Sequence, residues 1–590
     1  MTNLDVSKLL RNVAAAYRIK DEQKYRFQII AYDKAADTLE NSPTELRELF
    51  KEQKLGDLPG VGPSIRAHLE ELLTTGKVKH FEEVFSSIPE AVFTLLDVPG
   101  FGPKKAYRLV TEFKLKNPKS VVADIRALAE QGKIDPLDGF GKKSQDDILT
   151  RIEEYGRGKT KTARMALPYA GELAKKMLAY LKECPAVEQV SPLGSLRRRK
   201  ETVGDIDIAV ASSEPAKVLQ HFVDYPHKER IIEKGDHTSS ILVSSGKQID
   251  LMVQPPEAFG SLLQHFTGSK DHNVHLREYA LSKGLSLSEY GIKKRGDESG
   301  KLTHYSTEEK FYAALGLQWI PPEMRENTGE IELAKKNELP TLLELKDMKG
   351  DFHLHSSYPI EPSHDMGNNT MEEMIAKAKS LGYSYLGFSE HNPSISKHTS
   401  LQTKAILEKR KEFIEQLNKK HNKSIRVFSL LETDILPNGN LAIDDDAISL
   451  LDATIVSVHS SFGMNRDEMT KRVLKGLSHP KAKILAHPTG RLINQRPPYE
   501  LDWAKVFAFC KEHHKALEIN AWPLRLDLND VLVREAVKQG VKLMIDTDSH
   551  SLEEMDLMEY GVSVARRGWA KPSDILNAMP YNDLAKWFSM

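Results

Sequence analysis

The sequence predicts a multidomain protein with a helical N-terminal region, a central α+β region and a C-terminal α/β barrel. Its 590 residues exceed the usual size of one domain several times over, so several hydrophobic cores are expected. Amphipathic segments separated by Gly and Pro come first, strand-like apolar runs follow, and from about residue 350 short apolar strands alternate with helical patterns. The hydrophobic fraction of 40% and the charged fraction of 28% are typical of a globular chain.

The composition excludes several classes of protein. The two cysteines, Cys184 and Cys510, are too few for a disulfide framework or a Cys-rich zinc knuckle, and they favour a reducing, cytoplasmic location. No apolar run of about 18 residues and no signal-peptide core occur, so we expect neither a membrane span nor secretion by the usual route. The net charge of −1 averages over a basic segment, residues 91–165, which holds 15 Lys and Arg against 10 Asp and Glu. Charge alone is typical of a solvated helical face, so nucleic-acid binding needs support from motifs.

The helical region, residues 1–160, contains a repeated turn. Residues 57–69 and 97–110 share the order apolar, Pro, Gly, apolar, Gly, Pro, followed by a helical stretch. The glycines allow a tight turn between two helices, and the second helix offers unpaired amides at its positive N-terminal end to a phosphate oxygen. A single copy could be a simple connecting turn, whereas two copies favour a grip on a nucleic-acid backbone that reads no bases.

These turns resemble helix-hairpin-helix DNA-binding motifs. A weaker third copy at 137–149 lacks the preceding Pro. The resemblance implies DNA contacts at Gly60, Gly62, Gly100, Gly102, Lys104 and Lys105.

Three acidic residues of the central region form the strongest chemical signal in the first half of the chain. Asp205 and Asp207 lie two apart in the strand-like run DIDIAV, so both face one side of a sheet, and Asp250 lies in a second run, QIDLMVQ. Three carboxylates can hold two Mg²⁺ or Mn²⁺ ions, which activate an attacking hydroxyl and stabilise a leaving pyrophosphate. Solvated acids on an edge strand are the alternative for an isolated Asp-x-Asp pair.

A glycine-serine turn precedes the acids. Gly194 and Ser195 provide hydrogen-bond donors for a triphosphate, and Arg198 adds a permanent positive charge. Together with the acids, this turn favours nucleotidyl transfer.

Residues 1–320 resemble the family X DNA polymerases of the DNA polymerase beta type, which have a small helical domain, a fingers-like helical segment, a palm and a nucleotide-selecting thumb. The resemblance implies that the three acids bind the catalytic metals and that Asp250 is the base, or assists the base, for the primer hydroxyl. The implied triphosphate-binding residues are Gly194, Ser195, Arg198 and Gly204. In the segment HFTGSKDHNVHLRE the implied nucleotide contacts are His265, Phe266, Gly268, Asn273 and Arg277.

Three positions depart from the pattern of that family. His265 replaces the Tyr that precedes Phe-Thr-Gly-Ser, so the exclusion of ribonucleotides is an open question. Gln248 stands where vertebrate enzymes carry an Arg near the acids. His68 aligns with the Schiff-base lysine of the small domain. Because histidine cannot form a stable imine with a sugar aldehyde, we expect deoxyribose-phosphate lyase activity by that route to be absent or weak.

The C-terminal region concentrates metal-binding side chains at the ends of its predicted strands. Residues 346–590 contain 12 of the 21 histidines, and His353 and His355 lie two apart in FHLH. The other candidates nearly all end apolar strand-like runs: His391, Glu432, His459, His487, Asp548 and His550. Because strand C-terminal ends converge at one mouth of an α/β barrel, this placement favours a shared metal centre over a local role for each histidine. Imidazole with carboxylate suits zinc, manganese or iron, and a metal-held hydroxide would attack phosphorus.

This pattern resembles the PHP (polymerase and histidinol phosphatase) domain, a distorted (β/α)7 barrel with a trinuclear metal centre. Asp365 or its neighbour His364 can fill one ligand position, because the stretch after FHLH is longer here than in the family. Arg491, Asn520 and Arg525 are expected near the same mouth. The implied ligands, of which the first two are also counted as catalytic, are His353, His355, Asp365, His391, Glu432, His459, His487, Asp548 and His550.

The order of the two halves resembles the bacterial family X polymerases (PolX). The implied division is a small helical domain with the first hairpin at 1–90, a fingers-like helical domain with the second hairpin at 91–165, a palm nucleotidyltransferase domain at 166–255, a thumb at 256–320, a linker at 321–345 and a PHP domain at 346–590.

The resemblance implies a DNA-directed DNA polymerase that fills short gaps in base excision repair and has 3′→5′ exonuclease activity, with room for 3′-phosphatase and abasic-site endonuclease action. The implied cofactors are Mg²⁺ or Mn²⁺ at the polymerase site and a trinuclear set of Mn²⁺ or Zn²⁺ in the barrel. Expected partners are gapped or primed DNA and deoxynucleoside triphosphates, for a cytoplasmic, nucleoid-associated monomer. Two alternatives stay open: a template-independent nucleotidyltransferase fused to a small-molecule phosphatase, and a DNA-end-binding protein whose barrel is a scaffold.

Overall fold

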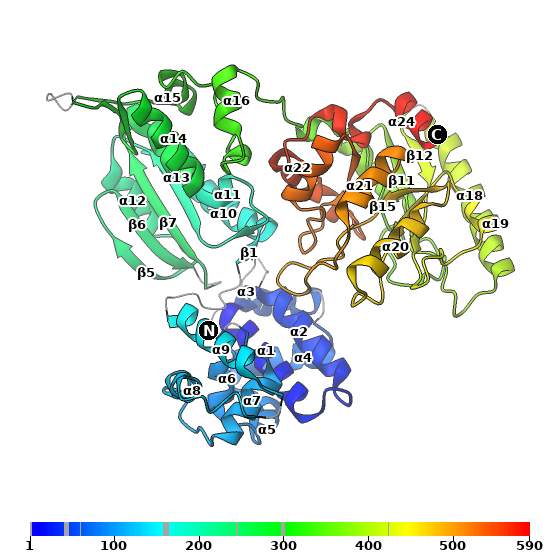
Figure 1. The fold of residues 1–590 in the computed structure, drawn as a ribbon, viewed down its shortest axis with the longest axis horizontal. Helices are drawn as coiled ribbons and strands as arrows, with labels where there is room; N and C mark the ends of the chain where they lie inside the picture. Colours follow the sequence, from blue (N-terminus) through cyan, green and yellow to red (C-terminus); the bar gives the residue numbers. More distant parts are fainter. Residues whose placement is uncertain are drawn as a thin grey trace.

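The computed structural model describes residues 3–40, 46–58, 61–98, 100–137, 139–156, 164–243, 246–296, 301–422 and 424–589. Figure 1 shows a helical lobe in blue and cyan, an α+β lobe from turquoise to green and a barrel lobe from yellow-green to red. The predicted order of helical region, α+β region and barrel is confirmed. Gly60, a predicted DNA contact, lies outside the described residues.

One hydrophobic core joins the helices of the N-terminal lobe. These helices are α1 (Asn3–Asp21), α2 (Arg26–Glu40), α3 (Leu46–Lys51), η1 (Leu55–Asp57), α4 (Pro63–Thr75), α5 (Lys79–Phe85), α6 (Glu90–Leu95), α7 (Pro103–Glu112), α8 (Val121–Glu130) and α9 (Lys142–Gly156). Pro63 and Pro103 occupy the first turns of α4 and α7, where the missing amide has no helical acceptor. The core runs without a break from Val6 to Ile152. The boundary expected near residue 90 therefore crosses a shared core, and the domain division stays a prediction.

The central lobe is built on a five-stranded mixed sheet with the order β2-β4-β7-β6-β5. Its elements are β1 (Met165–Ala166), α10 (Leu167–Lys182), β2 (Gln189–Pro192), α11 (Gly194–Arg197), β3 (Thr202–Val203), β4 (Ile206–Ala211), α12 (Pro215–Val223), β5 (Lys228–Lys234), β6 (Thr238–Val243) and β7 (Gln248–Gln254). The strands β4 and β7 are parallel, and the other neighbours in this sheet are antiparallel. Alternate residues such as Ile206, Ile208 and Leu251 are buried in one core with side chains of α10 and α12. The residues between them therefore face the other side of the sheet.

The thumb region packs helices against a three-stranded antiparallel sheet with the order β10-β9-β8. Its elements, with the segment that follows, are η2 (Pro256–Ala258), α13 (Phe259–Thr267), α14 (Lys270–Ser282), β8 (Leu285–Ser288), β9 (Gly291–Lys294), β10 (Leu302–Thr303), α15 (Glu308–Ala314), η3 (Pro322–Met324), α16 (Glu330–Lys336) and η4 (Leu345–Asp347). The expected linker, 321–345, is packed: Met324, Ile331 and Leu342 are buried in the core that contains Phe311. These apolar side chains remove surface from water against the thumb, so the segment is part of a folded core and differs from the exposed linker that the sequence predicted.

The C-terminal lobe is a closed, irregular barrel. Its strands are β11 (Tyr385–Phe388), β12 (Arg426–Ser429), β13 (Glu432–Asp434), β14 (Thr454–Ser457), β15 (Ala482–Leu485), β16 (Ala516–Asn520) and β17 (Lys542–Asp546). Its helices are α17 (Met371–Ser380), α18 (Ser400–His421), α19 (Asp445–Ile448), α20 (Arg466–Leu477), α21 (Trp503–Glu512), α22 (Asp530–Gln539), η5 (Glu554–Leu557), α23 (Met558–Arg567), η6 (Pro572–Asp574), η7 (Leu576–Ala578) and α24 (Tyr581–Ser589). The strands β13 to β17 form one parallel sheet in chain order, and β11 pairs in parallel with β12. An extended segment at Leu354 closes the ring by bridging in parallel to Ser549 and by accepting an amide hydrogen bond from Ser389.

The barrel bottom and the molecular surface complete the fold. Trp587 and Phe588 of α24 join Phe352 and Phe428 in a separate core under the strands.

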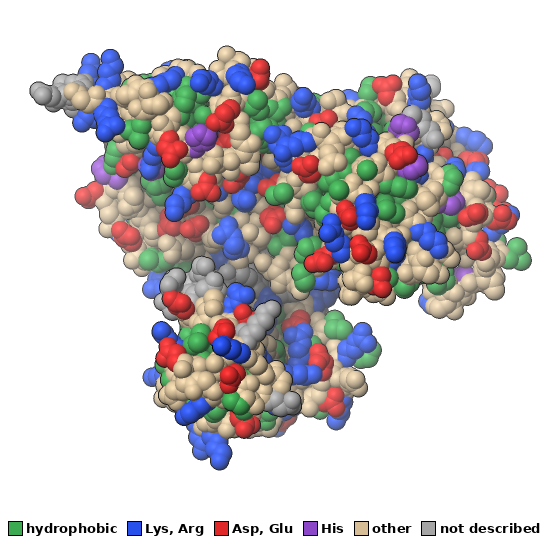
Figure 2. Space-filling view, in the orientation of Figure 1, with side chains coloured by type: hydrophobic (Ala, Val, Ile, Leu, Met, Phe, Trp, Pro, Cys, Tyr) green, Lys and Arg blue, Asp and Glu red, His purple; other side chains and the backbone are tan. Residues whose placement is uncertain are grey.

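No helix among the described residues is long and apolar enough to cross a membrane. Figure 2 shows acidic and basic side chains intermixed over the visible face.

Candidate active sites

The three predicted acids of the central lobe lie together. Asp207 in β4 pairs with Asp250 in β7, and Asp205 directly precedes β4. One carboxylate oxygen of each lies within 4.8 Å of the other two. Burial and the charges of Asp205 and Asp250 raise the pKa of Asp207 to about 7, and Gln248 donates a hydrogen bond of 2.8 Å from Nε2 to Asp250. Three mutually repelling carboxylates suit divalent cations, so these residues fit Mg²⁺ or Mn²⁺.

The glycine-serine turn lies against these acids. Gly194 has a φ of +55°, and a Cβ there would lie 2.8 Å from Oδ2 of Asp207, so only glycine fits without strain. Ser195 follows it in α11. Arg198 donates to the carbonyl oxygen of Thr267 in the thumb. The turn therefore connects the acids with the thumb. Gly204, the other predicted residue of this group, lies where a Cβ would approach Arg164 Nη1 to 3.0 Å.

The predicted nucleotide-selecting residues are His265, Phe266, Gly268, Asn273 and Arg277. Asn273 donates from Nδ2 to the carbonyl oxygen of His265 at 2.7 Å. A Cβ on Gly268 would lie 2.9 Å from Nη1 of Arg198, so this segment touches the glycine-serine turn. Burial lowers the pKa of the half-buried His265 imidazole. The rings of His265 and Phe266 are tilted relative to each other, with centroids 4.8 Å apart. Arg277 is exposed on α14.

The two predicted phosphate-binding turns lead directly into α4 and α7. Gly62 and Gly102 are the extended N-cap residues of α4 and α7. Because glycine has no side chain that could accept a hydrogen bond, the first amides of both helices lack a side-chain cap. Gly100 has a φ of +84°, in the left-handed region. Lys104 forms an exposed ion pair of 2.6 Å with Glu22, and Lys105 lies over the rings of Phe101 and Phe140.

The residue at the Schiff-base position lies in a pocket of aromatic rings. His68 Nδ1 is hydrogen-bonded to the hydroxyl of Tyr32 at 2.9 Å, and its ring stacks on His80 with centroids 4.8 Å apart. Burial and the neighbouring His80 lower the pKa of His68. No lysine amine takes this position, so the expectation of weak lyase activity by this route stays a prediction.

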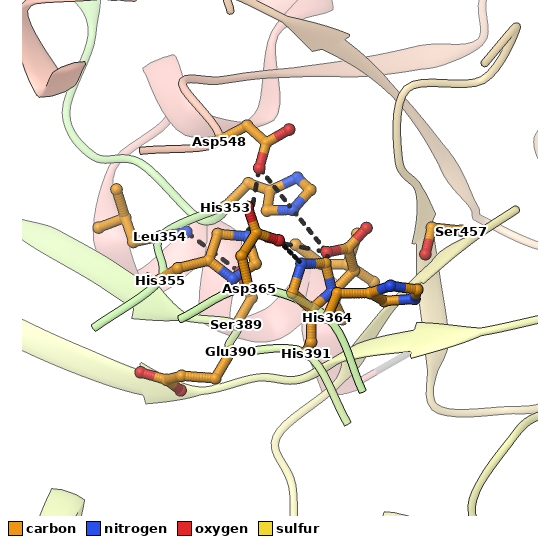
Figure 3. Close-up of polar contacts among 12 residues, drawn as sticks. His353, Leu354, His355, His364, Asp365, Ser389, Glu390, His391, Ser457 and Asp548 are labelled. Atoms are coloured by element: carbon orange, nitrogen blue, oxygen red, sulfur yellow. Dashed lines mark hydrogen bonds and ion pairs between the residues drawn. The ribbon is translucent and has the colours of Figure 1, made fainter. Parts of the chain in front are cut away.

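The predicted ligands of the barrel converge at one end of its strands, as Figure 3 shows for part of the set. Four groups have ligand atoms within 4.8 Å of one another: His353, His355 and Asp548; His355, His391 and His550; His364, His391 and His459; and Glu432, His459 and His487. Glu432 lies near the middle of the cluster, with Oε1 3.0 Å from His487 Nε2 and Oε2 2.8 Å from His391 Nδ1.

Unused ligand atoms in this cluster point to metal ions. Among the described residues, buried atoms without a hydrogen bond include His353 Nε2, both ring nitrogens of His355, Glu432 Oε2 and His487 Nδ1. Leaving a buried polar atom unpaired is costly, whereas a coordinate bond satisfies it. Burial and the neighbouring imidazoles of His550 and His391 lower the pKa of His355 to about 3, so this ring is neutral and can donate a lone pair. The residues present therefore fit a cluster of Zn²⁺ or Mn²⁺ ions.

Both alternatives for the uncertain ligand lie at the cluster. A carboxylate oxygen of Asp365 lies 3.3 Å from His391 Nε2, and the other lies 3.6 Å from His550 Nε2. The hydrogen bond from His391, together with the charge of His550, lowers the pKa of Asp365. His364 Nε2 lies 3.2 Å from Asp434 and belongs to a candidate ligand group. The choice between them stays open.

Two carboxylates of the barrel were missed by the sequence reasoning. Asp434 accepts a hydrogen bond of 2.6 Å from His459 Nδ1, and Glu518 accepts one of 2.6 Å from His353 Nδ1. Such partners orient the ligand rings and fix which nitrogen is free for a metal. The sequence contains a pattern that could have indicated both carboxylates. Asp434 follows Glu432 by two residues in the same strand, and Glu518 lies in the apolar run that forms β16.

The three polar residues expected near the mouth occupy different places. Asn520 Nδ2 donates to Asp548 at 3.1 Å, and Arg525 Nε lies 3.4 Å from the same carboxylate. Arg491 instead pairs with Glu201 of the central lobe at 2.7 Å. Substrate roles for these residues stay predictions.

The fold and the two sites define a class of protein: a metal-dependent nucleotidyltransferase joined to a metal-dependent phosphoesterase barrel. Family models match the helix-hairpin-helix domain at residues 1–78, the DNA polymerase beta thumb at 262–326 and the PHP domain at 351–521. The DNA polymerase/3′-5′ exonuclease PolX of Bacillus subtilis (strain 168) is 34% identical over 586 residues, which cover 99% of each chain.

More distant relatives cover about half of this chain. The DNA polymerase lambda of Arabidopsis thaliana is 25% identical over 354 residues, 55% of this chain and 62% of the relative. That of Rattus norvegicus is 23% identical over 352 residues, 55% and 56% of the two chains. The chain therefore belongs to the PolX family of bacterial family X DNA polymerases that carry a PHP domain.

Proposed function

We propose that the protein is a DNA-directed DNA polymerase that fills short gaps during DNA repair and removes nucleotides from 3′ ends with the 3′→5′ exonuclease activity of its barrel. The observation that carries the proposal is the presence of two separate centres in one chain, a triad of carboxylates in the palm and an imidazole-carboxylate cluster in the barrel. Full-length similarity to a PolX polymerase and exonuclease supports both activities.

In the palm, the chain's own residues place the reacting groups. Asp205, Asp207 and Asp250 would hold divalent ions, which would neutralise charge on the primer hydroxyl and the pyrophosphate. Asp250, oriented by Gln248, receives the proton of the primer hydroxyl directly or assists its removal. The amides of the glycine-serine turn and Arg198 bind the triphosphate.

In the barrel, the ligand residues would hold Zn²⁺ or Mn²⁺, which would activate water at neutral pH and polarise the phosphodiester. Glu518 and Asp434 accept hydrogen bonds from Nδ1 of His353 and His459, which leaves Nε2 of each ring available to a metal ion. Asp365, with His364 as the alternative, is assigned to the remaining ligand position of the centre.

The partners follow from these activities. Gapped or primed DNA is held through the hairpin turns, and deoxynucleoside triphosphates bind between palm and thumb. We propose a cytoplasmic location on the DNA of the nucleoid, on the basis of the DNA substrate and the two free, buried cysteines. A monomeric state is proposed with it.

A single labelled substrate tests both activities. A duplex with a one-nucleotide gap is incubated with Mn²⁺, with and without deoxynucleotides. Extension by the base complementary to the template, and shortening of the primer when nucleotides are withheld, are the expected results. Extension without regard to the template base would favour the template-independent alternative. A protein that binds the duplex and changes neither end would favour the scaffold alternative.

A further inference from the structure

The barrel contacts the polymerase half at two points that follow the glycine-serine turn. Arg567, the last residue of α23, donates from Nη1 to the carbonyl oxygen of Arg198 at 2.7 Å. Shortly after Arg198 in the chain, Glu201 pairs with Arg491 of the barrel at 2.7 Å. Both arginines come from the second half of the chain, so the turn is supported by a domain that is hundreds of residues away in sequence.

Arg567 also belongs to a chain of alternating charges that ends at Arg198. Its Nη2 donates to Glu326 at 3.1 Å and to Asp530 at 2.5 Å, and its Nε donates to the same oxygen of Asp530 at 2.8 Å. Arg198 donates from Nε to the same oxygen of Glu326 at 3.1 Å. The Arg567 side chain is 2% exposed, so these bonds are shielded from water and salt. The two arginines share one carboxylate oxygen, and the position of Arg198 depends on Arg567 and Asp530.

The turn lies where a small displacement matters. Gly194 touches Asp207 of the metal-binding triad, and Arg198 touches the Thr267–Gly268 segment of the thumb. A shift of about 1 Å in a positioning group can cost about a hundredfold in rate. Only arginine supplies donors to a carbonyl and two carboxylates from one planar group, because a lysine ammonium has no fixed fork.

We propose that Arg567 is a positioning residue of the polymerase reaction, through which the PHP barrel holds the nucleotide-binding turn in its productive place. The barrel is then part of the nucleotide site as well as a second enzyme. This inference rests on the proposed assignment of Arg198 to the triphosphate.

The test compares full-length Arg567→Gln and Arg567→Lys with the control Arg566→Gln. Arg566 precedes Arg567 on α23 and binds Glu323 and the carbonyl oxygen of Leu343, away from the turn. In Arg567→Gln we expect KM for the incoming nucleotide to rise about tenfold, equivalent to about 1.4 kcal/mol, with a smaller fall in kcat. Arg567→Lys should fail to restore KM, Arg566→Gln should leave it unchanged, and exonuclease rates without nucleotides should be the same in all of them.

Three further measurements keep the outcomes distinct. Asp530→Asn removes the charge of a partner of Arg567 and keeps the shape of the Asp530 side chain, so it should also raise KM. If Arg567→Gln unfolds and loses both activities, the KM of Asp530→Asn decides whether this network positions the turn. In a double-mutant cycle, Glu326→Gln and Arg567→Gln should be non-additive, and additive effects would overturn the proposed network. Arg198→Ala separates the assumptions: a raised KM in this variant with an unchanged KM in Arg567→Gln refutes the positioning role alone. An unchanged KM in Arg198→Ala refutes the assignment of Arg198 and the inference with it.

Discussion

The buried ion pair between palm and thumb makes a quantitative prediction. Glu308, at the start of α15, accepts hydrogen bonds from Arg325 at 2.6 Å and from Arg197 at 2.9 and 2.7 Å. Burial alone would raise the pKa of Glu308, yet Arg325 and Arg197 lower it from 4.5 to about 2. One pKa unit corresponds to about 1.4 kcal/mol, so the ionised carboxylate contributes about 3 kcal/mol to the stability of this region.

Glu308→Gln keeps the shape of the side chain and removes its charge. Arg325, which is 0% exposed, then lacks a carboxylate partner, so we expect a loss of about 3 kcal/mol at pH 7. Because the folded pKa lies below the ordinary value, the contribution of Glu308 is complete above pH 4.5 and disappears as the pH falls toward 2. The wild-type thumb should lose this stability between those values, and the variant should lack that part of the pH dependence.

Hydrogen exchange of the α15 amides measures the local stability directly. A loss of about 3 kcal/mol lowers the protection of these amides by about two orders of magnitude. Glu309→Gln, at the exposed neighbouring position, is the matched control and should leave protection unchanged. Primer extension should fall with Glu308→Gln, and the barrel exonuclease should persist. If protection stays within a few-fold of wild type, or if the acid-induced loss is the same in the variant, the reasoning about Glu308 is wrong.

Three further predictions concern the two centres. Asp205→Ala with Asp207→Ala should abolish primer extension and spare 3′-end degradation, whereas His353→Ala should do the reverse; loss of both activities in either folded variant would contradict the division. Gly194→Ala should reduce synthesis by about tenfold or more in a steady-state assay, because its Cβ would lie 2.8 Å from Asp207 and its φ is +55°. Removal of metal ions with a chelator should lower the thermal midpoint of the barrel, seen by calorimetry, because buried imidazoles then lose their partners; an unchanged midpoint in a protein shown to have lost its metals would count against a buried cluster.

Much of both sites could be predicted from local sequence patterns. The alternation of Asp and Ile placed Asp205 and Asp207 on one face of a sheet, and the structure brings Asp250 beside them. In the barrel, the ends of successive apolar runs predicted the ligands because parallel strands bring their carboxyl ends to one mouth. These inferences needed only the period of a strand and the rule of barrel closure.

Other features depend on distances that no local pattern contains. Whether His364 or Asp365 faces the centre depends on the path of a long loop, and both reach it. The expected linker packs into the thumb core because its apolar residues meet partners from other segments.

The sequence by itself determined the chemistry of this protein: the kinds of ligand, their spacing within each strand and the turns that approach phosphate. Only the tertiary structure decided how the two halves support each other, since Arg567 meets Arg198 across 369 positions of the chain. Side-chain chemistry and strand periodicity are local properties, whereas a contact between domains is decided by the packing of complete surfaces.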